Sequence, residues 1–199
     1  QNIQFRNSDY SGDADISITG GDLLSNAVNI NAGQGTADLN VGELTGTLNT
    51  YGLASHVIAD TAVLNLGEQC LTGDPTYYNS GNINISGNIT VGEKLAVIAS
   101  GNITNSGAGG YSITARNAGV GQDITMIAGA AFTTASAGAG TATLTGAPPA
   151  GAVPGGGTVT VNGGSAAGGS ITLTTGAGVS LIDASGTTGA GGNVTLLAF

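Results

Sequence analysis

Three aspartates near the start of the chain are the residues best suited to bind a metal ion. Asp9, Asp13 and Asp15 lie close together, and Asn7 adds a side-chain amide nearby. Ca²⁺ prefers oxygen ligands from carboxylates and amides, so this stretch is a candidate calcium site. The glycine–aspartate nonapeptides of calcium-binding toxin repeats do not occur in the sequence. We therefore favour a solvated acidic turn, and we expect no cofactor.

The chain contains a single histidine, His56, and a single cysteine, Cys70. His56 has no second histidine and no cysteine close to it in sequence, which predicts a structural or exposed histidine rather than a metal ligand. One cysteine excludes an internal disulfide, and we expect Cys70 to be a buried or half-buried free thiol. Neither residue indicates a catalytic centre.

The charged residues are too dispersed to predict an enzyme. Polysaccharide-active enzymes built on β-helices need clustered carboxylates for calcium or acid–base chemistry, together with an arginine or a lysine. The three cations, Arg6, Lys94 and Arg116, are far apart in the sequence, and only Asp123 and Asp183 follow Lys94 among the acids. We predict no catalytic residues, and a polysaccharide lyase or hydrolase remains the alternative function.

Threonine pairs suggest a second, less favoured alternative. Thr143-Leu144-Thr145, Thr158-Val159-Thr160 and Thr172-Leu173-Thr174 resemble the pairs that form the ice-binding faces of small solenoids. A flat ice-binding face needs such pairs in most coils, and these three do not form a continuous series.

Composition and charge bound the partners and the location. Three cations against twelve acids give a net charge of −9, which argues against nucleic acid as a partner. No window of 18 apolar residues is present, so we expect no membrane span. Low charge with abundant Gly, Thr, Asn and Ser is common in exported bacterial surface proteins. We therefore expect a secreted or cell-surface location, with Gln1 a processed end or a cut from a longer chain.

The elements that must position these residues are short strands that begin at glycines. A recurring unit consists of glycine, one or two polar residues, a β-branched isoleucine or valine, usually a threonine after it, and often another apolar residue. Examples are Gly87-Asn88-Ile89-Thr90-Val91 and Gly192-Asn193-Val194-Thr195-Leu196. This alternation predicts short half-buried strands, with glycines at tight corners. Residues 52–59 are the only stretch that could form a helical turn.

One apolar anchor per unit gives a nearly regular spacing of 20–24 residues, with one longer interval. The anchors are Ile16, Leu39, Val63, Ile83, Ile103, Ile124, Leu144, Ile171 and Val194. A strand-and-turn repeat of this length predicts an all-β solenoid in which each coil bonds to its neighbours. Because parallel crossovers are nearly always right-handed, we predict a single right-handed parallel β-helix of about nine coils over residues 1–199. Loops are expected to leave it near 67–80 and 146–157.

Equivalent residues should stack along such a solenoid in two structural ladders. We expect an apolar column of anchors along the axis, made of Ile83, Ile103, Ile124 and Val194. We expect a polar column at a corner from the residues that precede them, Asn82, Asn102, Asp123 and Asn193. Asparagine suits this place because it tolerates turn conformations and its amide can pair with the same group one coil away.

The most regular part of the chain carries a resemblance to a known family. Residues 95–108 read Leu-Ala-Val-Ile-Ala-Ser-Gly-Asn-Ile-Thr-Asn-Ser-Gly-Ala, and Ile113-Thr114-Ala115 follow. This run resembles the repeats of filamentous-haemagglutinin-type exoproteins, the β-helical adhesins exported by two-partner secretion. The resemblance is good over residues 81–130, looser over 158–199 and general before 80. The Asn-Pro-Asn signature of that family's secretion domain does not occur in the chain.

The resemblance implies a non-catalytic structural or adhesive element of a bacterial cell-surface or extracellular fibre. The expected partners are the chain itself, stacked end to end, or the rest of a longer chain, with surface glycans as a further class. Leu196, Leu197 and Phe199 are the candidate end-stacking residues, because a last coil exposes unpaired backbone and apolar side chains.

Overall fold

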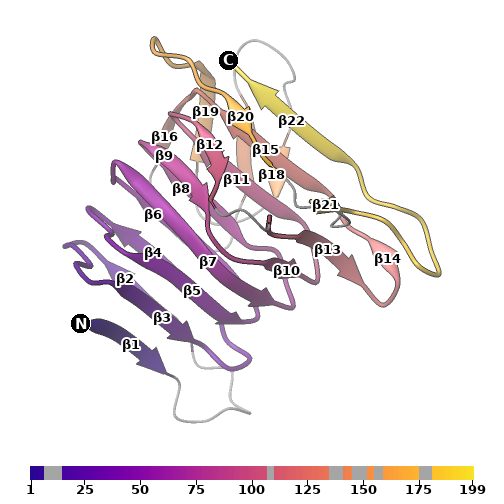
Figure 1. Ribbon diagram of the computed structural model, residues 1–199, viewed down its shortest axis with the longest axis horizontal. Helices are drawn as coiled ribbons and strands as arrows, with labels where there is room; N and C mark the ends of the chain where they lie inside the picture. The colour runs from indigo at the N-terminus through magenta and orange to yellow at the C-terminus, as the bar shows by residue number, and fades with distance from the viewer. Residues whose placement is uncertain (7–14, 107–109, 135–140, 145–151, 155–158, 175–180) are drawn as a thin grey trace.

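The computed structural model describes residues 1–6, 15–106, 110–134, 141–144, 152–154, 159–174 and 181–199 (Figure 1). Within them the chain forms strands and turns and no helix, which confirms the all-β prediction. The strands belong to an eleven-stranded, a seven-stranded and a four-stranded sheet. Up to β15 the chain passes repeatedly between the two larger sheets, so that successive circuits stack on one another.

The strand bounds follow this division. The eleven-stranded sheet contains β1 (Asn2–Arg6), β3 (Ala27–Asn31), β5 (Thr47–Gly52), β7 (Val63–Leu71), β9 (Asn82–Ile85), β10 (Ile89–Val91), β12 (Ile103–Asn105), β13 (Ile113–Asn117), β14 (Val120–Gly121), β20 (Ile171–Thr172) and β21 (Ile182–Asp183). The seven-stranded sheet contains β2 (Ile16–Thr19), β4 (Ala37–Val41), β6 (Ser55–Ala59), β8 (Thr76–Asn79), β11 (Leu95–Ala99), β15 (Ile124–Ala128) and β22 (Val194–Ala198). The four-stranded sheet contains β16 (Ala130–Thr134), β17 (Thr141–Leu144), β18 (Ala152–Pro154) and β19 (Val159–Gly164).

The two larger sheets are parallel ladders, as a solenoid requires. Each strand of the seven-stranded sheet pairs in parallel with the strand from the next circuit, from β2 through to β22. The same holds along β1, β3, β5, β7, β10 and β13, and Figure 1 shows these strands stacked as a rising series. Only β14 pairs antiparallel within these two sheets, in a small hairpin with β13. This pairing confirms the prediction of an all-β chain with parallel strands in stacked sheets.

The anchors stack in two columns rather than the single one expected. Ile83 pairs with Ile103, which pairs with Ile171 on the next circuit. Ile124 lies in the other sheet, where it pairs with Leu95 and Val194. The single column was therefore wrong at Ile124 and at Val194, and Val194 is also exposed because it lies on the last strand of the described stack. The repeated unit opens strands in both sheets, so its spacing does not reveal on which side of the coil a strand lies.

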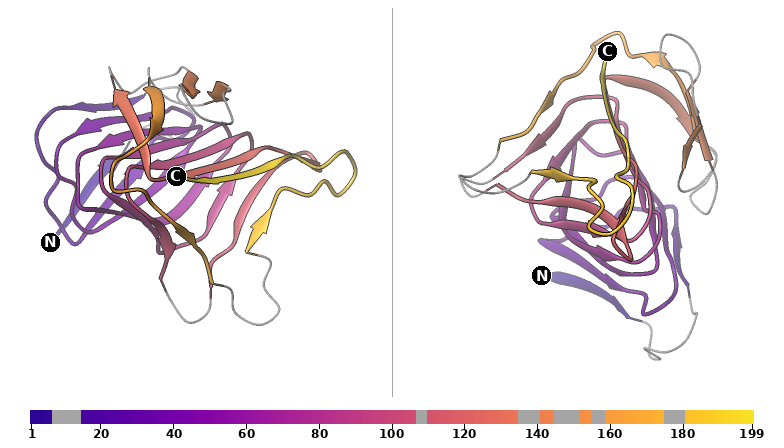
Figure 2. Two further views of the ribbon diagram at one scale, coloured as in Figure 1. Left: turned by 90° about the horizontal axis from the view of Figure 1, so that it is seen from above. Right: turned by 90° about the vertical axis from the view of Figure 1, so that its right-hand side faces the viewer.

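The ladder is interrupted by the four-stranded sheet. After Ala128 the chain forms β16 to β19 and then returns to pair Ile171 with Ile103. Leu144, one of the expected anchors, lies in this separate sheet opposite β19. One strand of the seven-stranded sheet belongs to each circuit, so the expected count of nine coils is not confirmed. Figure 2 shows the four-stranded sheet beside the ladder.

One of the two expected loops is instead part of the ladder. Residues 67–80 contain the end of β7 and all of β8, and Tyr77 and Tyr78 are fully buried there. The prediction failed because prolines, glycines and tyrosines obscured the alternation. Residues 52–59, the expected helical turn, likewise contain strand β6. The second loop, 146–157, lies outside the described residues except for β18.

The main core runs between the two larger sheets and consists of stacked Ile, Leu and Val side chains. A second apolar column lies on the opposite face of the seven-stranded sheet. It is formed by Ile58, Tyr78, Ile98, Ile127 and Leu197, which pair in register from strand to strand. Apolar burial on both faces makes β6 and β11 continuously buried, unlike the half-buried strands expected.

Candidate functional site

Side-chain oxygens at the corners of the coil bind the backbone of the next circuit. Asn82 accepts a hydrogen bond at Oδ1 from the N–H of Asn102, at 2.8 Å. Asn102 accepts at Oδ1 from the N–H of Ser170, also at 2.8 Å, and from its hydroxyl at 2.9 Å. Each bond joins equivalent positions of adjacent circuits. The polar ladder therefore continues from Asn102 to Ser170, although the four-stranded sheet lies between these two residues in the sequence.

The same contact recurs in the other sheet. Asp123 accepts at Oδ1 from the N–H of Asn193 at 2.8 Å, and from its side-chain amide at 3.2 Å. Hydrogen bonding by the Asn193 N–H, with a smaller contribution from Lys94, lowers the pKa of Asp123 below its ordinary value of 3.8. The Lys94 Nζ lies 3.5 Å from the Asp123 carboxylate. The polar residues named from the sequence thus form ladders, but in two columns.

The glycine of the repeated unit is needed for close approach. A Cβ on Gly101 would clash with the Oδ1 of Asn82, the atom that binds the N–H of Asn102. A Cβ on Gly81 would meet the carbonyl oxygens of Thr61 and Ala62 in the same way. Neither glycine has a positive φ. Space for the stacked backbone, rather than a left-handed turn, explains these two glycines.

Asp15, from the candidate calcium site, belongs to the same kind of corner. Its Oδ1 accepts from the N–H of Thr36 at 2.8 Å, one circuit away. Asp9 and Asp13 lie outside the described residues, so the calcium site as a whole stays a prediction. Among the residues that the structure describes, no three or more His, Cys, Asp or Glu side chains are grouped to hold a metal ion.

His56 is a buried structural histidine, and Cys70 is not the buried thiol that we expected. His56 is only 4% exposed, and its Nδ1 lies 2.8 Å from Oδ1 of Asp38 on the neighbouring strand. Cys70 is exposed. The reason is strand alternation in β7, because its neighbours Gln69 and Leu71 both point into the core.

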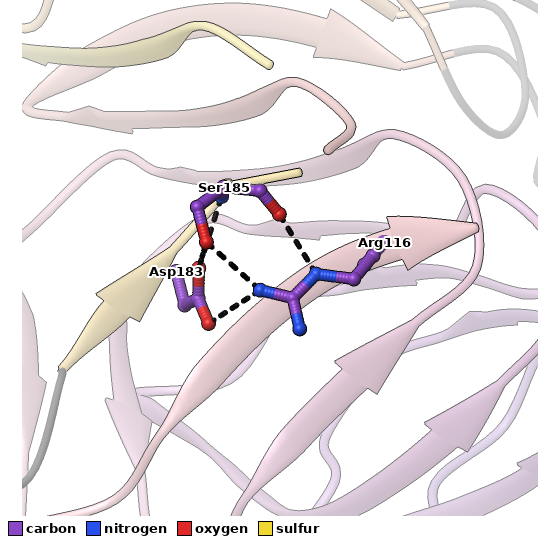
Figure 3. A network of polar contacts seen from close by, with 3 residues as sticks. All are labelled: Arg116, Asp183 and Ser185. Carbon is purple, nitrogen blue, oxygen red and sulfur yellow. Dashed lines mark hydrogen bonds and ion pairs between the residues drawn. The ribbon is translucent and has the colours of Figure 1, made fainter. Parts of the chain in front are cut away.

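Arg116 forms the most elaborate polar contact between circuits (Figure 3). Its Nη2 donates to Asp183 at 2.8 Å and to the Ser185 hydroxyl at 2.9 Å, while Nε donates to the Ser185 carbonyl at 2.7 Å. The hydroxyl and N–H of Ser185, and then Arg116, lower the pKa of Asp183. The contacts connect β13 to β21 and the loop that follows it. These two strands pair directly, although the four-stranded sheet lies between them in the sequence.

These ionic pairs have a common geometry that the sequence did not reveal. His56–Asp38, Lys94–Asp123 and Arg116–Asp183 each join residues on, or directly before, paired parallel strands. Charges that are scattered along the chain are thus brought together two at a time. Such pairs can hold adjacent circuits in register.

The end-stacking residues divide between two environments. Leu197 and Phe199 pack against the second apolar column, and Phe199 also forms backbone hydrogen bonds with Ala128 and Gly169. Leu196 continues the inward column beside Met126 but is 50% exposed, because β22 is the last strand of the described stack. Leu197 and Phe199 are thus partly covered by the chain itself, and end stacking stays a prediction.

A groove with a volume of about 300 Å³ lies on β1, β3 and β5. Its polar lining consists of Gln4, Arg6, Asn29, Asn31 and Tyr51. The sequence did not predict this site, although strict alternation in β1 and β3 places these polar residues on one outward face. The missing information was the register that sets Tyr51 beside Asn31. Among the described residues, this groove and the corner ladders are the two candidate functional features.

Comparison of the chain with protein-family models, with curated proteins and with solved structures found no match. No helix capable of crossing a membrane occurs among the described residues.

Proposed function

We propose that this chain is a non-catalytic structural and adhesive element of a bacterial cell-surface or extracellular fibre. The observation that supports it best is the use of polar side chains as connections between circuits. Asn82, Asn102 and Asp123 each bond to the backbone of the next circuit, and the ionic pairs join neighbouring strands. A solenoid whose circuits are connected in this way can be long and rigid, as a fibre element must be.

We infer one continuous right-handed solenoid, because parallel strands joined through another sheet strongly favour that hand. The exposed inward face of β22, marked by Leu196, is a place for a further coil to dock. That coil comes either from a longer chain or from another copy stacked end to end, which covers unpaired strand edges.

The composition favours a location outside the cell, whereas the exposed thiol of Cys70 does not. Cys70 is free and exposed, and oxidising surroundings would favour its pairing with a second molecule. The abundance of glycine and the low charged content, 8%, nevertheless match a secreted repeat protein. The resemblance to haemagglutinin-type repeats supports the same location.

Two measurements on the purified chain test this function. Electron microscopy and light scattering of the Cys70→Ser variant are expected to show concentration-dependent rods, if copies supply the docking coil. A turnover screen on neutral and uronate-containing polysaccharides, with and without Ca²⁺, is expected to show no product. Robust turnover that is lost on changing Asp15 or Asp183 would contradict the proposal and favour the polysaccharide-active alternative.

A further inference from the structure

We propose that the groove on β1, β3 and β5 binds a short neutral oligosaccharide, with Tyr51 as the surface on which a sugar ring stacks. This inference rests on the adhesive part of the proposed function, to which it gives a ligand class. The register of the three strands, the exposure of Tyr51 and the hydrogen-bonding capacity of the amides around it support this assignment.

Strand register builds the floor of the groove. Gln4 pairs with Asn29, and Asn29 pairs with Asn49, which gives one outward row of amides. Arg6 pairs with Asn31 and Asn31 with Tyr51, which gives a second row two residues further along the strands. Three strands spaced about 4.8 Å apart give a floor about 10 Å wide, enough for one or two sugar rings.

Tyr51 supplies an aromatic face at one side of this floor. It is 40% exposed, and it is the most exposed aromatic side chain among those whose burial the structure describes. Partial burial, helped by Glu68 and Cys70, raises the pKa of its hydroxyl above 10.0, so the phenol is neutral at physiological pH. A neutral ring with a polar tip suits the C–H face and hydroxyl rim of a sugar.

The amides beside Tyr51 are held in place through their oxygens. The Asn31 Oδ1 accepts the N–H of Gly33 at 3.1 Å, and the Asn29 Oδ1 accepts from the Asn49 amide at 2.9 Å. These bonds fix both side chains and direct their remaining amide hydrogens toward other acceptors. Rigid amide donors are what a ring of sugar hydroxyls can use, because little side-chain entropy is lost on binding.

Charge decides between neutral and acidic sugars. The chain carries a net charge of −9, which opposes the approach of a polyanionic glycan. Arg6 is the only cation among the groove residues, and it already has an interaction partner. A neutral oligosaccharide is therefore the class that the groove fits best.

The test is saturation-transfer NMR, followed by calorimetric titration, on the intact chain. The probes are neutral tetrasaccharides of glucose, galactose and mannose, with trigalacturonate as the acidic comparison. At least one neutral probe is expected to bind, and Tyr51→Ala is expected to weaken it about tenfold, while Tyr51→Phe retains most of the affinity. Asn31→Ala is expected to weaken binding by a smaller factor.

The matched control is Thr90→Ala, which changes an exposed side chain in the same outward row two strands beyond Tyr51. It should leave binding unchanged, and unaltered thermal melting of every variant shows that the fold is intact. Absence of binding to all neutral probes, binding only to trigalacturonate, or binding that Tyr51→Ala does not affect would each overturn the inference. Fibre formation without sugar binding would reject the groove alone, whereas polysaccharide turnover would reject the proposed function.

Discussion

Asparagine and aspartate side chains at the corners connect each circuit to the next one. Their oxygens bind backbone N–H groups that would otherwise face solvent at the start of the next strand. These bonds are exposed, so each one contributes modestly, and together they fix the start of each strand relative to the neighbouring circuit. A short side chain whose oxygen lies two bonds beyond Cβ reaches the backbone of the adjacent circuit, which explains why the unit repeats Asn and Asp at this point.

Removal of one such oxygen tests the ladder. Asn102→Ala deletes the acceptor for both the N–H and the hydroxyl of Ser170. We expect a loss of about 1 kcal/mol in the free energy of unfolding, measured by urea denaturation. Asn117→Ala, which changes an exposed asparagine on β13, is the matched control and should have almost no effect. Equal effects of the two changes would contradict a structural role for the ladder.

The Arg116–Asp183 contact predicts a defined pH dependence. Because the folded state lowers the pKa of Asp183 below 3.8, its contribution is fully present above that pH and is lost as pH falls through the lower folded value. Asp183→Asn should therefore reduce the free energy of unfolding at pH 7, by less than about 1 kcal/mol because the pair is partly exposed.

At pH 2 the difference between Asp183→Asn and the parent chain should be smaller than at pH 7, because protonation of the folded Asp183 removes the charge that the variant lacks. Urea denaturation at both pH values measures it, and exposed Glu93→Gln serves as the control for loss of a carboxylate. A difference of the same size at pH 7 and pH 2 would mean that the carboxylate charge is not what stabilises this contact.

At the scale of the strand, β7 and β8 place polar residues inside an apolar column. Gln69 replaces an isoleucine or leucine in the series that includes Ile89 and Ile113, and it is fully buried. Its Nε2 donates to the Leu48 carbonyl at 2.7 Å, and its Oε1 accepts from the Tyr77 hydroxyl at 2.8 Å. Burial raises the pKa of Tyr77, so the hydroxyl remains a donor.

This buried pair predicts non-additive stability changes. Tyr77→Phe leaves the Gln69 Oε1 without its donor and should lower the free energy of unfolding by about 1–3 kcal/mol. Gln69→Leu leaves the Tyr77 hydroxyl without its acceptor and should cost a similar amount. The double variant should be less destabilised than the sum of the two, by about 1 kcal/mol or more, in a urea-denaturation cycle. Additive costs would show that the two groups do not depend on each other.

The same strands show where sequence reasoning succeeds and where it fails. The Gly-Asn-Ile unit correctly predicted parallel stacking of Ile83 on Ile103, because its alternation and its glycine reflect local sterics. The assignment of Ile124 failed, since equal spacing cannot tell which of two sheets a strand joins. Gln69 and Tyr77 hid β7 and β8, because their polar side chains are buried and find their partners on other strands, including each other.

The candidate sites also divide into those with a local sequence pattern and those that depend on register between distant strands. Asn82 and Asn102 could be named from the sequence because the ladder repeats locally. The groove could not, because it depends on the register between Asn31 and Tyr51 on separate circuits. Pairings such as Arg116 with Asp183 were equally hidden, since the four-stranded sheet separates the two residues in sequence.

At the scale of the whole molecule, one ladder continues across an inserted sheet. The circuit that contains Ile103 is followed directly by the one that contains Ile171, although β15 and the four-stranded sheet lie between them in sequence. Figure 1 shows β20 beside β12 in accordance with this register. The proposed fibre requires such continuity, because an interrupted ladder would not transmit stacking from one end to the other.

Disulfide trapping tests this continuity most directly. In a Cys70→Ser background, Thr104→Cys is combined either with Thr172→Cys, its observed register partner, or with Thr125→Cys, its partner under regular spacing. Adjacent parallel strands place Cα atoms about 4.8 Å apart, within the range that a disulfide spans. We predict rapid oxidation of the Thr104/Thr172 pair within the monomer and none of the Thr104/Thr125 pair. Preferential oxidation of the Thr104/Thr125 pair would contradict the account.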